Sequence, residues 1–394
     1  MPPQRRLCLV ALNPTDSVTD GYLPAAAELD LRVTLLTNQP DAHARAYAGL
    51  PHAPDEIVAC DVRDFRAIID HVERNERPAA VFTNSDHLQT QTALAATYAG
   101  LPAKDWQVAL RAKNKAQLRR HLARAGVDSV WSREVLPGET VEDPPFPCVV
   151  KPREGVASED VVLVADAAEL ATVCADIWSH RPEPLVVEEF LAGELRSLET
   201  LGDRSALRVM GGFRTTLSAP PYFVERSTVF DPEPDAGPVL AQLAALGVGF
   251  GACHTEYVVS GDRVRLIEVN YRAIGDQCDL LLAETTGVPL FEQILRVHVG
   301  EPLPPAPDPP ARAGRVDWPC VDRDGLLVHA PPPVDEQRDD VHLVYRPLRG
   351  LGDALVLTNT NRDYLGVLRT TGPNGSTVDT VAADFLDVHR WDIR

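Results

Sequence analysis

Lysine is scarce in this chain of 394 residues. Only Lys104, Lys113, Lys115 and Lys151 are present, and every other basic side chain apart from histidine is arginine. Lysine offers a compact point charge on a flexible stem, which suits a phosphate oxygen better than the planar fork of arginine does. The four lysines are therefore candidates for anion binding, with chance placement as the alternative for each.

Several patterns that would assign the chain to other protein classes are also missing. The seven cysteines are odd in number, scattered and never spaced C-x-x-C, which argues for reduced thiols and against disulfides or a zinc site. No apolar run approaches the length needed to span a membrane. The N-terminal apolar run is too short for a signal-peptide core and lacks a small-residue cleavage site, so we expect a first buried strand and a cytoplasmic protein.

The composition is that of an ordinary globular protein with a strongly acidic balance. Hydrophobic residues make up 44% of the chain and charged residues 24%, with a formal net charge of -19. That charge argues against nucleic acid or an anionic membrane surface as a partner. A protein of this charge can bind a small anion only where it gathers its few cations locally.

The first hundred residues alternate between expected strands and helices. We expect strands at Arg5–Leu12, Leu31–Thr37, Ile57–Cys60 and Ala79–Thr83, and helices at Tyr22–Leu29, Asp64–Glu76 and Asp86–Ala99. This alternation indicates an open α/β domain with a parallel sheet. The loop after the first strand lacks G-x-G-x-x-G, which argues against a nicotinamide or flavin cofactor. At the end of the last strand, Thr83–Asp86 is best explained as a helix cap.

A β-hairpin is expected near the middle of the chain, within residues 251–276. Two stretches rich in β-branched and apolar residues, Cys253–Val259 and Val264–Val269, flank the turn residues Ser260–Asp262. The number of loop residues decides which side chains share a face, because a slip of one residue turns a strand over.

Oxygen-bearing side chains gather on this hairpin. Glu268 and Asn270 share a face, because side chains alternate along a strand. A three-residue loop would place Glu256 opposite Glu268 on that face, whereas a two-residue loop would turn Glu256 away. Two carboxylates and an amide oxygen suit Mg²⁺, with phosphate oxygens completing its shell, and Arg272 follows as an anion contact. The alternative is the solvated face of an ordinary hairpin.

Two further stretches carry anion-binding or ring-binding signals. Arg111–Gly126 is expected as one helix with Lys113 and Lys115 near its start. Leu185–Phe190 is expected as an edge strand whose free backbone groups could recognise an adenine ring between apolar side chains. A solvated basic helix and an ordinary charged edge strand are the respective alternatives.

Residues 147–164 are expected to form a strand, a polar loop and a second strand. The first strand ends at Lys151, and the loop contains Gly155 and Ser158. A lysine at the edge of a buried strand is costly unless it meets an anion. A loop of small residues can offer backbone N–H groups to phosphates. A hairpin with a solvated lysine is the alternative.

Taken in order, these pieces resemble the ATP-grasp superfamily of carboxylate–amine ligases. The order is an α/β domain, a lysine-bearing helix, K-P with a small-residue loop, E-E-F-L-x-G, H-T-E and E-x-N-x-R. The similarity runs from the first strand to about Gly300, and the combination is specific although no single piece is. The run from Gly251 to Pro289 is most similar to the branch that makes amino-acid and dipeptide amides in antibiotic and siderophore pathways.

The resemblance implies binding of ATP and Mg²⁺, with Mn²⁺ as an alternative metal. It implies phosphate contacts from Lys115, Lys151 and Ser158, and a hinge that contacts adenine, made of Glu188, Glu189, Phe190 and Leu191. It implies metal ligation by Glu256, Glu268 and Asn270. Arg272 would contact the transferred phosphoryl group or the acyl-phosphate.

The sequence departs from the family pattern at the ribose and phosphate contacts. Leu195 stands where the family usually has the ribose-binding glutamate, so Glu194 is the candidate substitute. Glu159 and Asp160 occupy phosphate-loop positions where small residues are usual, which would weaken phosphate binding unless they point away. Asn114 stands where the family usually has aspartate before Lys115.

Substrate contacts are expected from two segments. The stretch Pro220–Ser227 resembles a family segment in which a carboxylate can hold a substrate amine, which makes Glu225 the candidate and Arg226 a candidate for a substrate carboxylate. His254 shares a face with Glu256 and could line the pocket, although a single histidine on a strand is more often structural.

The resemblance implies a fold that is α/β and α+β, in four parts. The expected parts are an N-terminal open α/β domain that precedes the ATP-grasp fold (residues 1–110), the small lid subdomain (111–185), the central subdomain (186–303) and a Pro-rich linker with a small C-terminal α+β region (304–394). The C-terminal region could act as a lid or as a dimer surface, and a homodimer is expected by analogy with the family.

The reaction implied is amide formation through an acyl-phosphate, with release of ADP and phosphate from small-molecule carboxylic acid and amine or amino-acid substrates. Two alternatives stand beside it. One is a non-catalytic ATP-binding scaffold or sensor, favoured by the missing ribose glutamate and the acidic loop. The other is a biotin-carboxylase type of enzyme, although the chain shows no biotin-carrier segment.

Overall fold

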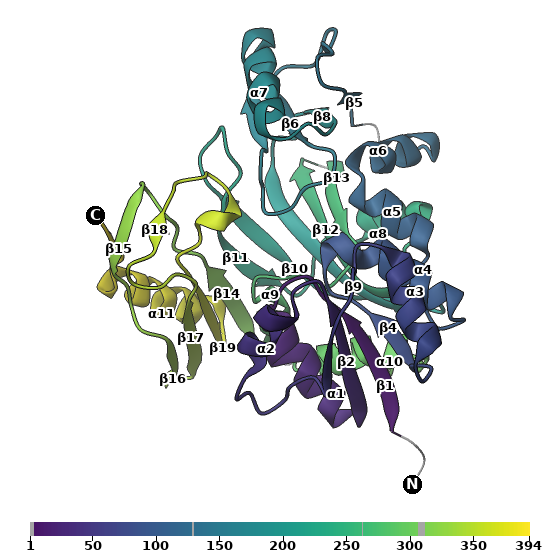
Figure 1. Ribbon diagram of the computed structural model, residues 1–394. Helices are drawn as coiled ribbons and strands as arrows, with labels where there is room; N and C mark the ends of the chain where they lie inside the picture. Colours follow the sequence, from purple (N-terminus) through teal and green to yellow (C-terminus); the bar gives the residue numbers. More distant parts are fainter. Residues whose placement is uncertain (1–3, 128–129, 262, 306–311) are drawn as a thin grey trace.

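The computed structural model describes residues 4–127, 130–261, 263–305 and 312–394 (Figure 1). Its N-terminal part is a parallel four-stranded sheet in the order β3-β2-β1-β4. The strands are β1 (Arg5–Val10), β2 (Leu31–Thr37), β3 (Glu56–Ala59) and β4 (Ala80–Phe82). The expected open α/β domain with a parallel sheet is confirmed.

Helices connect and cover these strands. They are η1 (Ser17–Tyr22), α1 (Leu23–Glu28), α2 (Pro40–Tyr47), α3 (Phe65–Arg74), η2 (Asp86–Leu88), α4 (Gln89–Tyr98) and α5 (Trp106–Lys113). The sequence did not predict α2, which buries only His43 and Tyr47 and so has little apolar periodicity.

The helix expected at Arg111–Gly126 is wrong in one respect, because it is two helices. The backbone leaves helical geometry at Asn114, which ends α5 and caps α6 (Lys115–Arg124) by accepting a hydrogen bond from Gln117 N–H at 3.0 Å. This break places Lys115 at the first position of α6.

A second, antiparallel sheet follows in the order β5-β8-β6-β7, which we call the lid sheet. Its strands are β5 (Ser132–Val135), β6 (Cys148–Pro152), β7 (Val162–Val164) and β8 (Leu185–Glu189), and α7 (Ala167–His180) joins β7 to β8. Helix α7 packs its buried residues Leu170, Cys174 and Ile177 into a core shared with this sheet.

The largest element is a nine-stranded antiparallel sheet in the order β13-β12-β9-β10-β11-β14-β19-β17-β16. Its strands are β9 (Glu194–Asp203), β10 (Leu207–Leu217), β11 (Glu225–Asp231), β12 (Phe250–Ser260), β13 (Arg263–Asn270), β14 (Ala313–Asp317), β16 (Val334–Arg338), β17 (Val341–Pro347) and β19 (Gly366–Gly372). The last four come from the C-terminal region, so that region continues the central sheet (Figure 1).

The remaining elements complete the central and C-terminal parts. They are α8 (Gly237–Leu246), α9 (Cys278–Thr286), α10 (Leu290–His298), η3 (Asn361–Asp363), α11 (Gly375–Val388) and a small sheet of β18 (Ala354–Leu355), β15 (Gly325–His329) and β20 (Asp392–Ile393). Residues 306–311 of the expected Pro-rich linker lie outside the described residues.

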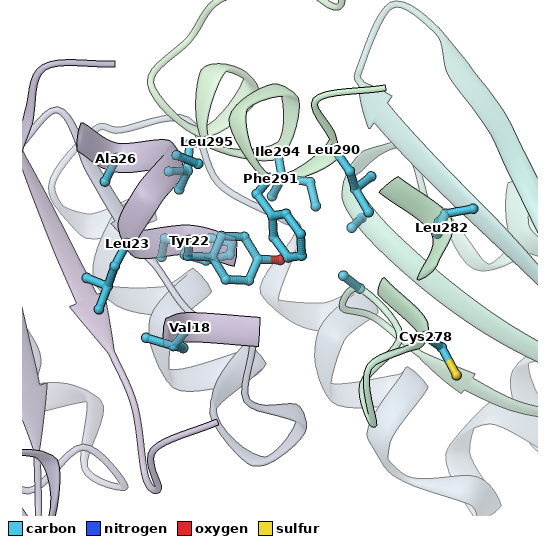
Figure 2. Packing of buried hydrophobic residues seen from close by; sticks show 14 of the residues in the cluster. Val18, Tyr22, Leu23, Ala26, Cys278, Leu282, Leu290, Phe291, Ile294 and Leu295 are labelled. Carbon is cyan, nitrogen blue, oxygen red and sulfur yellow. The ribbon is translucent and has the colours of Figure 1, made fainter. Parts of the chain in front are cut away.

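The N-terminal domain is fixed to the rest of the chain by a shared hydrophobic core. Figure 2 shows η1 and α1 packed against α9 and α10, with Tyr22 beside Phe291. Their rings meet edge to face with centroids 5.0 Å apart. A Cβ atom on Gly21 would lie 2.4 Å from the Phe291 ring, so glycine is required there for the two layers to approach.

All seven cysteines are free, in agreement with the expected reduced thiols. No helix among the described residues is both long and apolar enough to cross a membrane.

Candidate active site

A cavity of about 480 Å³ opens where the lid sheet faces the nine-stranded sheet. Its walls come from β6, the loop after it, the end of β8, and strands β9 to β13. Apart from the hinge residues and Glu194, the sequence indicated nine residues for ATP, metal or catalysis, and all nine line this cavity. One hollow therefore collects side chains from most of the chain.

The hairpin β12–β13 places Glu256, Glu268 and Asn270 on one face as expected, but its loop has two residues and not three. The ladder closes at Ser260 paired with Arg263, which leaves two residues between them, of which Asp262 lies outside the described residues. The register then shifts at Ile267, which has no partner, and Glu256 comes to lie opposite Glu268. This β-bulge restores the shared face that a two-residue loop alone would have lost.

The two lysines expected at phosphates are both buried and both paired with a carboxylate. Lys115 Nζ lies 2.8 Å from Glu268 Oε2, and Lys151 Nζ lies 2.7 Å from Glu188 Oε2. Burial alone would lower the pKa of Lys115, but the Glu268 carboxylate beside it holds that pKa above its usual value. Burial lowers the pKa of Lys151, and Glu188 opposes that effect. Both ammonium groups line the cavity.

Glu188 is an anchor for cations, which corrects its expected place in an adenine-reading edge. Arg119 donates from Nε and Nη2 to its two carboxylate oxygens at 2.8 and 3.0 Å, and Lys151 completes the cluster. Burial would raise the pKa of Glu188, but the two cations lower it to about 2.

The expectation of an edge strand at Leu185–Phe190 is wrong for its first five residues. Strand β8 lies between β5 and β6, so the backbone of Glu188 and Glu189 is paired within the sheet. The Glu189 carboxylate accepts from Trp131 N–H at 2.9 Å and from Arg265 Nη1 at 2.8 Å. The chain leaves the ladder only at Phe190 and Leu191, which line the cavity.

An apolar slot surrounds that point of exit. It is lined by Val149, Phe190, Leu191, Leu195, Val258 and Ile267. A slot of this kind, next to backbone leaving a sheet, suits a flat heterocycle. Glu194, in contrast, is not among the cavity-lining residues, because its carboxylate pairs with Arg196 at 2.6 Å and is 47% exposed. The structure therefore gives Glu194 no contact with the cavity, and the interpretation of Glu194 as a ribose ligand loses its support.

The loop expected to cover phosphates lies over the cavity and has its acidic residues tied down. Ser158 lines the cavity. Asp160 accepts from Arg181 Nε at 2.9 Å, and Glu159 accepts from Arg362 Nε at 2.8 Å. Each carboxylate thus has a cationic partner, which reduces its repulsion of an anion in the cavity.

His254 is held between two carboxylates. Its Nδ1 lies 2.7 Å from Glu199 Oε1, and its Nε2 lies 3.2 Å from Glu256 Oε1. Burial would lower its pKa, but the two carboxylates, Glu199 foremost, raise it to about 10. With both ring nitrogens donating, His254 is an imidazolium near neutral pH and has no lone pair to act as a general base there.

Three further carboxylates, Glu225, Glu256 and Asp276, line the cavity near one another, and we call this part of the cavity its carboxylate-rich end. Burial, together with Glu256 and Asp276 nearby, raises the pKa of Glu225 to about 8. Desolvation also raises the pKa of Asp276. Arg226, which was expected to hold a substrate carboxylate, is exposed and is not among the cavity-lining residues, so the structure places it elsewhere.

Arg272 reaches the cavity from the segment after β13. Its Nη1 donates to Ala273 O at 2.8 Å, and its Nε lies 4.0 Å from Asp86 Oδ1. The other Asp86 oxygen pairs with Lys113. Asp86 makes no capping hydrogen bond to η2 or α4, so the interpretation of Thr83–Asp86 as only a helix cap is wrong. Its carboxylate instead contacts Lys113 and lies beside Arg272 and Asn270.

Two side chains of the oxygen cluster, Glu268 and Asn270, have a spacing that fits a divalent cation. The Asn270 amide atom that faces the carboxylates lies 2.9 Å from Glu268 Oε1 and 3.2 Å from Asp86 Oδ1. If that atom is nitrogen, it donates to both; if it is oxygen, the spacing approximates the edge of an Mg²⁺ octahedron, which is about 3 Å for ligands at 2.1 Å. Among the described residues no three His, Cys, Asp or Glu side chains surround one point, so the fit depends on the amide.

Several residues of the site were not predicted. Arg119, Asp86, Glu199, Asn361 and Arg362 anchor or line the cavity, and they come from four separate parts of the chain. Arg119 follows Lys115 by one helical turn, which places both on the same face of α6 and is a signal that the sequence did offer. The others are brought in by the fold.

Known proteins resemble this chain in structure and not in sequence. No protein-family model and no curated protein sequence matches it. An L-amino acid ligase from Bacillus licheniformis matches with a TM-score of 0.82 at 20% identity, over 99% of both chains. A phosphoribosylglycinamide synthetase from Anaerococcus prevotii matches with a TM-score of 0.72 at 15% identity, over 99% of this chain and 100% of the other.

A third solved structure was determined with nucleotide and metal. It is the biotin carboxylase domain dimer of the 2-oxoglutarate carboxylase of Hydrogenobacter thermophilus, in complex with MgADP, ADP and bicarbonate. Its TM-score is 0.69 at 14% identity, over 98% of this chain and 90% of the other. At such identities these likenesses establish the fold that the chain shares with them, over nearly its full length.

Proposed function

This chain has the ATP-grasp fold along nearly its whole length, and from that premise we propose that it is an ATP- and Mg²⁺-dependent ligase. The reaction joins a carboxylic acid to an amine or amino acid through an acyl-phosphate and releases ADP and phosphate. A peptide or siderophore pathway of secondary metabolism is the proposed setting. The observation that carries the proposal is one cavity with buried cations, an apolar slot and a carboxylate-rich end.

Nucleotide binding is proposed for the half of the cavity beneath the lid sheet. The apolar slot at Phe190 and Leu191 takes the adenine ring, with the backbone of Leu191 as the hinge contact. Lys115, Lys151 and the loop at Ser158 meet the phosphates. In P-loop enzymes and kinases alike, catalysis of phosphoryl transfer is mostly positioning and charge neutralisation, which these groups supply.

Metal binding is proposed for Glu256, Glu268 and Asn270, with Mg²⁺ or Mn²⁺ as the ion. The bound ion would neutralise the phosphate charge and hold the γ-phosphoryl group in line with the attacking carboxylate. Lys115 bonds the Glu268 oxygen Oε2 and leaves Oε1 on the side of Asn270, so Oε1 would be free for the metal ion while the Lys115 ion pair stays in place. His254 keeps Glu256 oriented by donating to it.

The acid and amine are proposed to meet at the other end of the cavity. Arg272 neutralises the substrate carboxylate and then the acyl-phosphate. Glu225 holds the substrate ammonium group. Because its pKa is raised to about 8, its ionised form is a stronger base than an ordinary carboxylate and can take the ammonium proton. The free amine attacks the acyl carbon, the C–O bond to phosphate breaks, and phosphate leaves.

The non-catalytic alternative loses part of its basis. It depended on acidic loop residues that would repel phosphates, and both are tied to arginines. A homodimer remains a prediction that the single chain does not address.

The proposal is tested by identifying the nucleotide product. Purified protein is incubated with ATP, Mg²⁺ and pools of amino acids and small polycarboxylic acids, and ADP, AMP and phosphate are measured. ADP and phosphate released only when both an acid and an amine are present would support the ligase, and the active pool would name the substrate class. AMP and pyrophosphate would contradict the acyl-phosphate and indicate adenylation. ATP binding without turnover would favour the non-catalytic alternative.

A further inference from the structure

The loop that covers the cavity has an unusual backbone for its composition. Ala157, Ser158 and Asp160 have φ values of 57°, 54° and 56°. Residues with a Cβ atom rarely adopt this left-handed conformation, and they keep it only where the surroundings hold them. Something outside the loop must therefore fix its shape.

The fixing contacts come from the C-terminal region, about two hundred residues later in the chain. Asn361 N–H donates to Ala157 O at 3.0 Å. Arg362 Nε donates to Glu159 Oε1 at 2.8 Å. Asn361 and Arg362 open the short helix η3, whose cap residue Thr360 accepts from Arg362 N–H at 3.1 Å. This capped helical turn therefore contacts the loop at two positions, Ala157 and Glu159.

The same turn also holds the strand that carries the substrate-end carboxylate. The Asn361 side-chain oxygen accepts from Glu225 N–H at 3.0 Å. Asn361 and Arg362 both line the cavity. One residue, Asn361, therefore contacts the loop with its backbone and strand β11 with its side chain.

We propose that Asn361 and Arg362 are positioning residues that hold the phosphate loop closed over ATP and tie its position to Glu225. The proposal builds on the proposed function, because it takes residues 155–161 to cover the ATP phosphates. It also explains why the loop contains acidic residues. Glu159 is the attachment point for Arg362, while Asp160 is anchored within the lid by Arg181.

The proposal predicts that the binding of ATP and the binding of the substrate amine affect each other. A substrate amine that orders Glu225 stabilises Asn361 and, through it, the closed loop. ATP and the amine are therefore expected to bind with positive coupling, each raising the affinity of the other by the same factor. No contact between the two substrates is needed for this effect.

The first experiment compares Asn361→Pro with Asn361→Ala. Both variants lose the side chain that meets Glu225, but only the proline variant also loses the N–H that meets Ala157 O. Asn361 is the first residue of η3, where a helix leaves its N–H unused, and Thr360 before it has the extended backbone that precedes proline (φ -131°, ψ 172°). The proline should therefore leave the turn itself intact.

Two readouts follow from this pair. Amide hydrogen exchange of residues 155–161 in nucleotide-free protein should be faster in the proline variant than in the alanine variant. The dissociation constant for MgATP, measured by calorimetry without acid or amine, should be higher in the proline variant by about two- to tenfold, the worth of one hydrogen bond. Equal exchange and equal affinity in the two variants would overturn the proposal.

The second experiment is a double-mutant cycle of Glu159→Gln and Arg362→Gln. The Arg362 side chain is 59% exposed, so this ion pair should change MgATP affinity by about fivefold at most. If Arg362 acts through Glu159, its substitution has no further effect in the Glu159→Gln background. An effect that persists there would mean that Arg362 contacts ATP directly and would contradict the positioning role. Arg323→Gln, which removes an exposed partner of Asp322, is the matched control.

The two proposals fail separately. If the unmodified protein does not bind MgATP, the proposed function fails, whereas hydrogen exchange of the loop needs no nucleotide and still tests the Asn361 contact. If MgATP binds normally in every variant and the loop exchanges equally, the proposed function stands and the positioning role is rejected.

Discussion

The two ends of the cavity differ in whether their carboxylates form ion pairs. At the lid-sheet end, Glu188 is bonded by Arg119 and Lys151, and Lys115 is bonded to Glu268. At the other end, Glu225 and Asp276 form no ion pair among the described residues, and the pKa of each is raised. The first end is electrostatically complete within the protein, whereas the second is not.

This difference indicates where ligand charge is needed. A buried cluster whose charged groups are all paired keeps its geometry before a ligand arrives, which suits the repeated binding of the same nucleotide. Carboxylates without cationic partners repel one another and gain most from a ligand that brings positive charge. Glu225 and Asp276 therefore suit a ligand that brings an ammonium group.

The largest expected effect separates the two ends by stability. Glu188→Gln leaves Lys151 and Arg119 buried with a neutral partner, and should lower the free energy of unfolding by about 3–5 kcal/mol. Glu225→Gln replaces a carboxyl group that has no ion-pair partner and that its raised pKa keeps mostly neutral near pH 7, so stability should be unchanged or higher. Thermal unfolding of both variants measures the contrast. Equal losses in the two variants would show that the two ends do not differ in this way.

The next effect concerns turnover. Glu268→Gln keeps the size of the side chain but removes the charge that is proposed to hold the metal, and ADP release should fall about 10²–10³-fold. Glu194→Gln, outside the cavity, is the matched control and should retain full activity. Comparable activity of the two variants would remove Glu268 from the proposed metal site.

The pH dependence of ligand-free stability sharpens the comparison further. His254 has a folded pKa of about 10, above its unfolded value of 6.5, so its contribution is complete below pH 6.5 and is lost as the pH rises toward 10. Glu225, with a folded pKa of about 8 and a usual value of 4.5, favours the folded state at low pH and loses that advantage as the pH rises through 8.

Thermal stability of the ligand-free protein should therefore fall between about pH 4.5 and 10, through Glu225 from pH 4.5 to 8 and through His254 from pH 6.5 to 10. His254→Gln should flatten the upper part of this decline, and Glu225→Gln the lower part. A pKa change of one unit corresponds to about 1.4 kcal/mol, so each of the two residues should change the free energy of unfolding by at most about 5 kcal/mol. Stability that rises across this range would contradict the assigned charge states.

The smallest expected effect is on metal binding when Asp86, which does not line the cavity, is substituted. Asp86→Asn should weaken Mn²⁺ binding about tenfold, because this carboxylate lies against the proposed ligand Asn270 and pairs with Lys113. Electron paramagnetic resonance of free Mn²⁺ measures this without turnover. Asp322→Asn, an exposed aspartate in the C-terminal region, is the control. Unchanged affinity in Asp86→Asn would exclude a role in metal binding.

The sequence predicted the parts of this site that depend on local pattern. The alternation of strands and helices identified the N-terminal sheet, and β2 has the bounds that its β-branched run indicated. The face shared by Glu268 and Asn270 follows from strand periodicity alone. Lys115 and Lys151 stood out because lysine is otherwise nearly absent.

What the sequence missed depends on contacts between distant segments. The bulge at Ile267 has no local signal, yet it decides which way Glu256 faces. Asp86 looks like a helix cap until Lys113 and Asn270 are placed beside it. Glu188 belongs to a central strand because β5 pairs with its free side, which no property of its own segment indicates. Arg362 reaches Glu159 only because the C-terminal strands join the central sheet.

The most direct test of the account follows one oxygen atom. The carboxylic acid substrate, once identified from the active pool, is labelled with oxygen-18 in its carboxylate and converted with ATP, Mg²⁺ and the amine, and the released phosphate is examined by mass spectrometry. An acyl-phosphate route transfers one carboxylate oxygen to phosphate in each turnover, because the C–O bond breaks when the amine attacks. Label found in AMP, or phosphate without label, would contradict the acyl-phosphate and with it the assignment of the two ends of the cavity.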